Sequence, residues 1–78
     1  MDYKKIHDNI IENAKNRILD KNIAIEKHHI IPKSIGGSDE KTNLVNLLPR
    51  EHYIIHILLT KIYPKNNSLI YAAWMMPN

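Results

Sequence analysis

The chain has 78 residues, a formal net charge of +3 and a sequence pI near 9.3. A chain of this length forms one domain with a modest core, which a metal ion or a second subunit often supplements. It contains no cysteine, and this excludes disulfides and thiolate zinc sites. We expect a single domain over residues 1–78 in the cytoplasm, because no segment reads as a membrane span or a signal peptide. The mild positive charge fits either a polyanionic partner or an ordinary solvated surface.

The first predicted element is a helix over residues 3–19. Its apolar stripe recurs every four residues, at Ile6, Ile10, Ala14 and Ile18. This spacing is typical of one helix face turned toward a core. Asp2 is suitably placed to cap the helix, and we expect His7, which also lies in this helix, to be a surface residue.

Two short strands are predicted next. A β-type run extends from Ile23 to His29, and Pro32 interrupts it. Residues 33–42 form a loop with Gly36-Gly37 as its turn signal. A second strand over residues 44–48 is close enough in sequence to pair with the first in an antiparallel hairpin.

Two helices complete the chain. Pro49 suits the first turn of a helix over about residues 50–62, whose apolar stripe is Ile54, Ile55, Leu58, Leu59 and Ile62. The last helix is predicted over about residues 67–76. Its large side chains, Tyr71, Trp74, Met75 and Met76, are expected mainly in the core, with an apolar dimer face as the alternative. The order of elements predicts an α+β fold.

Four of the five histidines are grouped around the predicted hairpin and the helix after it. His52 and His56 share one helix face, one turn apart, which is the geometry of a metal clamp and also of many plain surface pairs. His28 and His29 close the first strand, where neighbours point to opposite faces. Because imidazole is a common metal ligand near neutral pH, one of these two can join the clamp while the other faces a substrate.

Asn43 opens the second predicted strand. Its amide both donates and accepts hydrogen bonds, so it can pin the long loop that precedes it. The plainer interpretation is a strand-entry residue of no special role, like Asn46.

Taken together, these pieces resemble a known family. The stretch EKHHIIPKSIGGSDEKTNLVNLLPREHYIIH, residues 26–56, is similar to the HNH endonucleases, and the flanking helices look like those of HNH proteins from phages and mobile elements. The resemblance implies a ββα-metal motif: a two-stranded antiparallel hairpin with a long loop, then a helix, flanked by an N-terminal and a C-terminal helix. The core motif would cover residues 24–62. One departure is Leu48, where many relatives carry a Thr or Ser that begins a capping box with Glu51.

The resemblance also implies roles for individual residues. His28, His52 and His56 would hold one divalent metal ion, which could be Zn, Mg, Mn or Ni. His29 would be the general base that activates water for hydrolysis of a DNA phosphodiester bond. Asn43 would tie the loop to the motif and help to orient His29. A metal with an open coordination position would stabilise the leaving 3′ oxygen.

Several points stay open at the level of sequence. Lys27, Lys33 and Arg50 flank the motif and either contact DNA phosphates or are solvated charges. A different class of function is a non-catalytic zinc-stabilised module that binds DNA or protein, with Glu26 or a neighbouring chain as the fourth ligand. A third is a small helical interaction domain with incidental histidines. A homodimer is also left open, since one active site cuts one strand.

Overall fold

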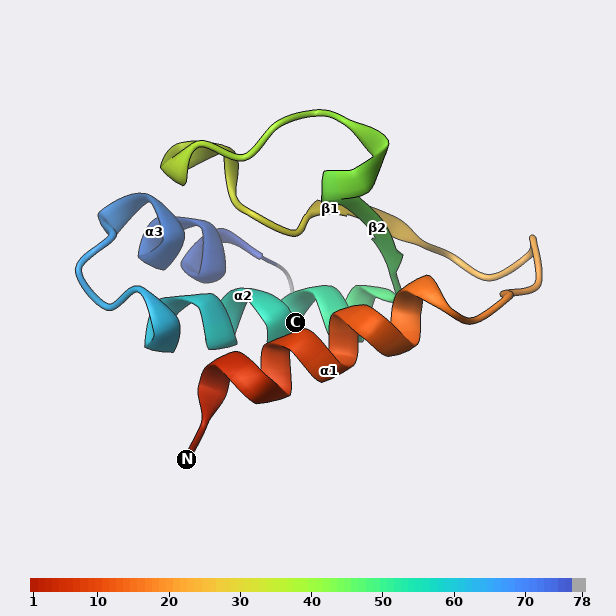
Figure 1. Cartoon of the computed structure of the whole chain (residues 1–78), viewed down its shortest axis with the longest axis horizontal. Helices are drawn as coiled ribbons and strands as arrows, with labels where there is room; N and C mark the ends of the chain where they lie inside the picture. The colour runs from red at the N-terminus through yellow and green to blue at the C-terminus, as the bar shows by residue number, and fades with distance from the viewer. Residues whose placement is uncertain (77–78) are drawn as a thin grey trace.

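The computed structural model describes residues 1–76 and has two strands and three helices (Figure 1). The elements in chain order are α1 (Tyr3–Lys15), β1 (Glu26–His29), β2 (Leu44–Leu47), α2 (Pro49–Ile62) and α3 (Asn67–Met75). Two single 3₁₀ turns, Lys33–Ile35 and Lys41–Asn43, lie in the loop between the strands. The predicted α+β arrangement of a hairpin followed by a helix, with a helix on either side, is confirmed.

Helix α1 is shorter than predicted. Asp2 caps its start, because its side chain accepts a hydrogen bond from the backbone N–H of Lys5 at 3.0 Å. The helix ends at Lys15 rather than at residue 19, and Ile18 is 100% exposed. Asn16 closes the last turn by donating its backbone N–H to the Glu12 carbonyl at 3.2 Å, and just beyond it the guanidinium of Arg17 bonds to Glu51 of α2.

His7 is buried, so the prediction of a surface position is wrong. Only 3% of the residue is exposed, and it lies one helical turn before Ile11 on the side of α1 that packs against the core. Its Nδ1 bonds to the Asp8 carboxylate at 2.9 Å.

The two strands pair antiparallel, with Glu26 opposite Leu47 and His28 opposite Val45. β1 begins at Glu26 rather than at Ile23, because Ile23 closes a turn by donating its backbone N–H to the Asp20 carbonyl at 3.0 Å. On β2 the side chains of Val45 and Leu47 are buried while the residue between them is exposed. One face of the hairpin therefore covers the helices.

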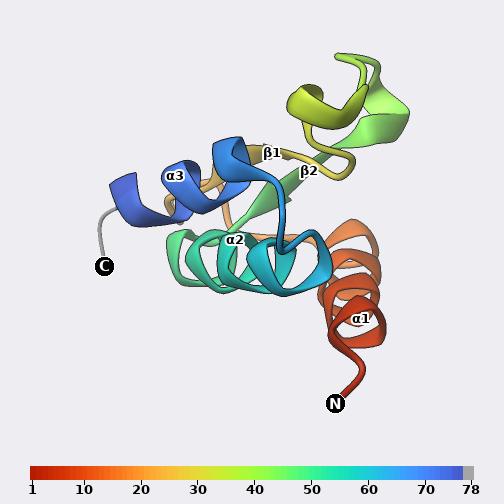
Figure 2. The ribbon, with the colours of Figure 1, turned by 90° about the vertical axis from the view of Figure 1, so that its left-hand side faces the viewer.

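The core lies where the hairpin, α1 and α2 meet (Figure 2). Leu47, Ile55 and Leu59 are its largest fully buried side chains. Helix α3 packs on α2, and the loop over residues 30–43 projects away from the helices at the end of the hairpin, as both views show (Figures 1 and 2). Within residues 1–76, no helix combines the length and the apolar character needed to cross a membrane.

The aromatic end of α3 is exposed, contrary to the expectation of core positions. Leu69 and Ala73 are buried, whereas Tyr71 is 66%, Trp74 83% and Met75 65% exposed. Asn66 caps the helix by accepting a hydrogen bond from the backbone of the third residue after it. Because α3 is a single terminal helix laid on α2, only one of its faces is covered by the described part of the chain.

Candidate metal centre and active site

Three of the predicted site histidines lie together between the hairpin and α2. His28 comes from β1, and His52 and His56 come from successive turns of α2. Each ring offers a nitrogen, and these nitrogens lie within 4.8 Å of one another. The ring centroids are 4.7 to 5.2 Å apart, and His28 is only 4% exposed. The sequence pattern placed these side chains correctly, and their role as ligands remains a prediction.

Burial keeps two of these imidazoles neutral at physiological pH. Burial is the largest influence on His28, and with the neighbouring histidines it lowers its pKa from 6.5 to about 3. Burial and the adjacent His52 lower the pKa of His56 to about 4. Neutral imidazole is the form that binds a metal ion. The cluster is therefore ready to bind a cation and poor at binding protons.

The arrangement fits a divalent metal ion. The Nε2 atoms of His52 and His56 lie 3.1 Å apart, and two imidazole nitrogens on one tetrahedral metal would be about 3.3 Å apart. Within residues 1–76, Nε2 of His28 is buried without a hydrogen-bond partner. A buried polar atom without a partner is costly, and a metal ion in the cluster is a natural reason for such packing of nitrogens.

Glu26 supports this cluster from the start of β1. Its Oε1 lies 2.8 Å from Nδ1 of His52, which donates its N–H to the carboxylate. A carboxylate on the outer nitrogen fixes the ring and its tautomer, and it leaves Nε2 free as a ligand. The sequence-based alternative had Glu26 as a fourth ligand. The signal that could have identified its actual contact is its spacing, two residues before His28 and hence on the same face of the strand.

His29, the predicted general base, is held by a residue that the sequence analysis did not single out. Its Nε2 lies 2.7 Å from Oδ1 of Asp39 in the loop, and Oδ2 of the same carboxylate accepts a hydrogen bond from Lys33 Nζ at 3.2 Å. The hydrogen bond from His29, followed by that from Lys33, lowers the pKa of Asp39 below its usual value. The carboxylate is therefore ionised, and the imidazole is the donor in this contact.

Asn43 pins the loop, as its amide chemistry allowed. Its Oδ1 accepts from the backbone N–H of Ile31 at 2.8 Å, while Nδ2 donates to the carbonyls of Ile31 at 3.0 Å and Ser38 at 2.8 Å. Gly37 lets the chain approach this closely, since a β-carbon there would lie 1.7 Å from the Ile31 carbonyl oxygen. Asn43 makes no side-chain bond to His29, so any effect on the base passes through the loop.

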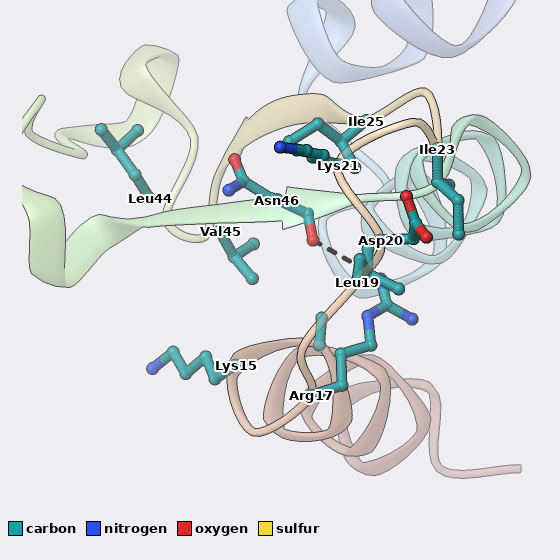
Figure 3. A pocket seen from close by; sticks show the side chains of 11 residues that line it. Lys15, Arg17, Leu19, Asp20, Lys21, Ile23, Ile25, Leu44, Val45 and Asn46 are labelled. Atoms are coloured by element: carbon teal, nitrogen blue, oxygen red, sulfur yellow. Dashed lines mark hydrogen bonds between the residues drawn. The ribbon is translucent and has the colours of Figure 1, made fainter.

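A second pair of side chains joins α1 to the start of α2. Arg17 forms a bidentate ion pair with Glu51. Its Nη2 also reaches the Asn46 carbonyl at 3.5 Å (Figure 3). Glu51 also accepts the backbone N–H of Leu48 at 2.8 Å. These contacts, with that of Arg17 foremost, lower the pKa of Glu51. Glu51 thus supplies its half of a capping box without a hydroxyl at Leu48, and Arg17 holds its carboxylate in place directly before the predicted ligand His52.

A cleft of about 250 Å³ opens beside the histidine cluster. It is lined by Lys27, His28, His29, Pro32, Lys33, His52 and His56. Two of the three predicted phosphate contacts, Lys27 and Lys33, are thus brought to the site, whereas Arg50 is exposed on the first turn of α2 and does not line the cleft. A larger cavity of about 520 Å³, between the end of α1 and β2 (Figure 3), is lined by none of the clustered histidines.

This geometry coincides with a match to known proteins. The family model for HNH endonucleases matches residues 15–56, which include all the clustered histidines, Asp39 and Asn43. The chain belongs to the HNH endonuclease family. No solved structure matches this HNH chain.

The relatives of this HNH chain include proteins of Enterobacteria phage T4. Probable mobile endonuclease D is 51% identical over 81 residues, covering 100% of this chain and 31% of the relative. Probable mobile endonuclease E is 49% identical over 78 residues, covering 100% of this chain and 54% of the relative. A bacterial relative, the type IV methyl-directed restriction enzyme EcoKMcrA of Escherichia coli K12, is 42% identical over 53 residues, which are 68% of this chain and 19% of the relative. The HNH chain therefore spans only about a third of the length of the first T4 relative and about half of the length of the second.

Proposed function

We propose that this HNH chain hydrolyses DNA phosphodiester bonds, with one divalent metal ion held by His28, His52 and His56. The observation that carries the proposal is the separation of the four histidines: three face one another, and His29 stands outside the cluster while lining the same cleft. A closed structural site has no use for a fourth imidazole at its entrance. We further propose that residues 1–78 act as one nuclease domain, with residues 24–62 as its core.

His29 acts as the general base in this proposal. Its imidazole accepts a proton from the water that attacks the phosphorus, and the 3′ oxygen leaves on the opposite side. A positioned base of this kind contributes about 10²–10⁴-fold to a rate. The metal ion, when bound, supplies the positive charge that stabilises the phosphate and its leaving oxygen. Glu26 keeps His52 in the orientation that this requires.

DNA is held by the basic side chains around the cleft. Lys27 and Lys33 line it, so both are close enough to contact the phosphate backbone at the scissile bond. Arg50 is proposed to contact a phosphate outside the cleft, at the exposed start of α2. Such contacts add affinity without reading the base sequence.

The test is a plasmid-cleavage assay with metal-free protein reloaded with Mg²⁺, Mn²⁺, Zn²⁺ or Ni²⁺. The neighbours His28 and His29 supply a matched pair of variants. His28→Ala should lose both metal binding and cleavage, whereas His29→Ala should bind metal like the wild type and lose cleavage by about 10²-fold or more. EDTA should abolish cleavage, and a single site should nick the plasmid before it linearises it.

Two results would contradict the proposal. Cleavage by His29→Ala at the wild-type rate with every metal would remove His29 as the base. A metal-loaded wild type that binds DNA but does not cut it would favour a non-catalytic zinc-stabilised module. Lys27→Ala and Lys33→Ala should each reduce the slope of log affinity against log salt by about one if these lysines contact phosphates.

A further inference from the structure

Asp39 is a side chain without an assigned role that touches the proposed base. It lies in the loop between the strands, and its carboxylate bridges Nε2 of His29 at 2.7 Å and Nζ of Lys33 at 3.2 Å. Both partners line the cleft beside the histidine cluster, but Asp39 itself does not. The carboxylate therefore holds the two side chains from outside the cleft and leaves the space for a substrate open.

The loop is built so that Asp39 returns to the end of β1. The amide of Asn43 holds the Ser38 carbonyl at 2.8 Å, one residue before Asp39. Gly37, where no β-carbon fits, brings the chain against the Ile31 carbonyl just before this point. Residues Gly37 to Asp39 are thereby fixed to the segment that follows His29. The path of the loop therefore brings Asp39 to His29, in addition to the attraction between the carboxylate and the imidazole.

We propose that Asp39 is the positioning residue of the general base, because it fixes the ring of His29 with the proton on Nε2 and the free lone pair on Nδ1. The proposal rests on the proposed nuclease function. In the reaction, Nδ1 takes one proton from the attacking water, and the new P–O bond forms as the bond to the 3′ oxygen breaks. That oxygen takes a proton from solvent. Asp39 then faces an imidazolium ion, whose charge it stabilises until the proton returns to solvent.

This arrangement also explains how Asn43 influences the base. Asn43 makes no side-chain bond to His29, yet it fixes the loop that carries Asp39. Asn43 therefore acts on His29 through a chain of contacts, in which it holds Ser38, the next residue Asp39 is fixed as a result, and Asp39 bonds to His29. A partner of this kind, one contact away from the chemistry, typically changes activity by about 10–100-fold when it is removed.

The test compares Asp39→Ala, Asp39→Asn and Glu40→Gln in the metal-loaded chain. Glu40 is the adjacent exposed carboxylate and has no side-chain hydrogen bond within residues 1–76, so its variant controls for the loss of charge from the loop. Asp39→Ala should lower kcat by about tenfold or more without raising KM for DNA or weakening metal binding. Asp39→Asn keeps an acceptor oxygen, so its kcat should lie between those of Asp39→Ala and the wild type. Glu40→Gln should have the kcat of the wild type. In a His29→Ala background, Asp39→Ala should cause no further loss.

A second measurement does not depend on cleavage. Nitrogen-15 NMR of the metal-free chain should show His29 as the Nε2–H tautomer in the wild type and as a mixture in Asp39→Ala. If the wild type cuts no DNA, the proposed function fails, and this tautomer alone decides whether Asp39 positions the ring.

Three results would overturn the role of Asp39. The first is an unchanged tautomer and kcat in Asp39→Ala. The second is a kcat that rises, since that would make the carboxylate a block on the base. The third is a KM for DNA that rises in Asp39→Ala while kcat stays unchanged, with the same result in Lys33→Ala. That result would show that Asp39 acts through Lys33 and not through His29.

Discussion

Replacing Asn43 with alanine tests how the long loop is held. The substitution removes three hydrogen bonds from a residue that is only 8% exposed, and it leaves the backbone N–H and carbonyl of Ile31 and the carbonyl of Ser38 without these partners. Each hydrogen bond has a net value of about 1 kcal/mol, and a buried group left without a partner costs about 1–3 kcal/mol. We therefore expect Asn43→Ala to lower the free energy of unfolding by about 3 kcal/mol. For a domain of this size that is a large part of the total.

Asn43→Asp is the sharper variant. Its carboxylate can still accept from the Ile31 N–H, but its second oxygen would face two carbonyl oxygens instead of donating to them. We expect it to destabilise the chain at least as much as alanine does. The assay is urea unfolding in EDTA, followed by circular dichroism, with Asn46→Ala as the control. Asn46 is an exposed asparagine on β2, three residues further along the chain, and its replacement should cost less than about 0.5 kcal/mol. A loss below 1 kcal/mol for Asn43→Ala, or wild-type stability of Asn43→Asp, would refute this account of the loop.

Three further predictions concern stability. Gly37→Ala should lower the free energy of unfolding by at least about 2–3 kcal/mol, because its β-carbon would lie 1.7 Å from a carbonyl oxygen. Gly36→Ala has open space around it but a φ of +100°, so it should cost about 1–2 kcal/mol. Equal losses of stability in thermal unfolding would contradict this difference. Arg17→Ala should lower the free energy of unfolding by about 2 kcal/mol, since it leaves the half-buried Glu51 without its bidentate partner. Arg17→Lys should recover less than half of that loss in the same assay. Full recovery would show that the two parallel hydrogen bonds of the guanidinium are unimportant. The metal-free chain should lose stability as the pH falls below 6.5, because the unfolded chain takes up a proton at His28 that the folded chain resists down to about pH 3. The loss should approach about 1.4 kcal/mol per pH unit for each group of this kind. His56, whose pKa is lowered to about 4, contributes a second such slope. Urea unfolding between pH 7.5 and 5 should therefore show a slope about half as steep in His28→Asn as in the wild type.

Much of the fold follows from local patterns. The stripe of isoleucines predicted α1, and Pro49 marked the start of α2 almost to the residue. The grouping of His28, His52 and His56 was also predictable, because a strand end and one helix face are regular structures whose side-chain directions are known.

The contacts that were missed depend on tertiary structure. Arg17 and Glu51 are 34 positions apart in the sequence, and no local pattern predicts their contact. Asp39 reaches His29 only because Gly37 permits a close backbone approach within a loop of irregular path. The exposure of Trp74 reflects which face of α3 is covered, and helical spacing alone does not specify this. Buried His7 was missed for the same reason.

The pairing of β1 has a consequence for how the chain tolerates insertions and deletions. His28 is buried opposite Val45, and His29, the next residue, lies opposite Leu44 on the other face. Adding or removing one residue within this four-residue strand would exchange the two histidines, so that the proposed base would enter the cluster and a proposed ligand would leave it. Extra residues in the loop between the strands leave this strand pairing untouched, although between Ser38 and Asn43 they would break the hydrogen bond that the Asn43 amide donates to the Ser38 carbonyl. A change of length is therefore expected to exchange base and ligand only within the strand.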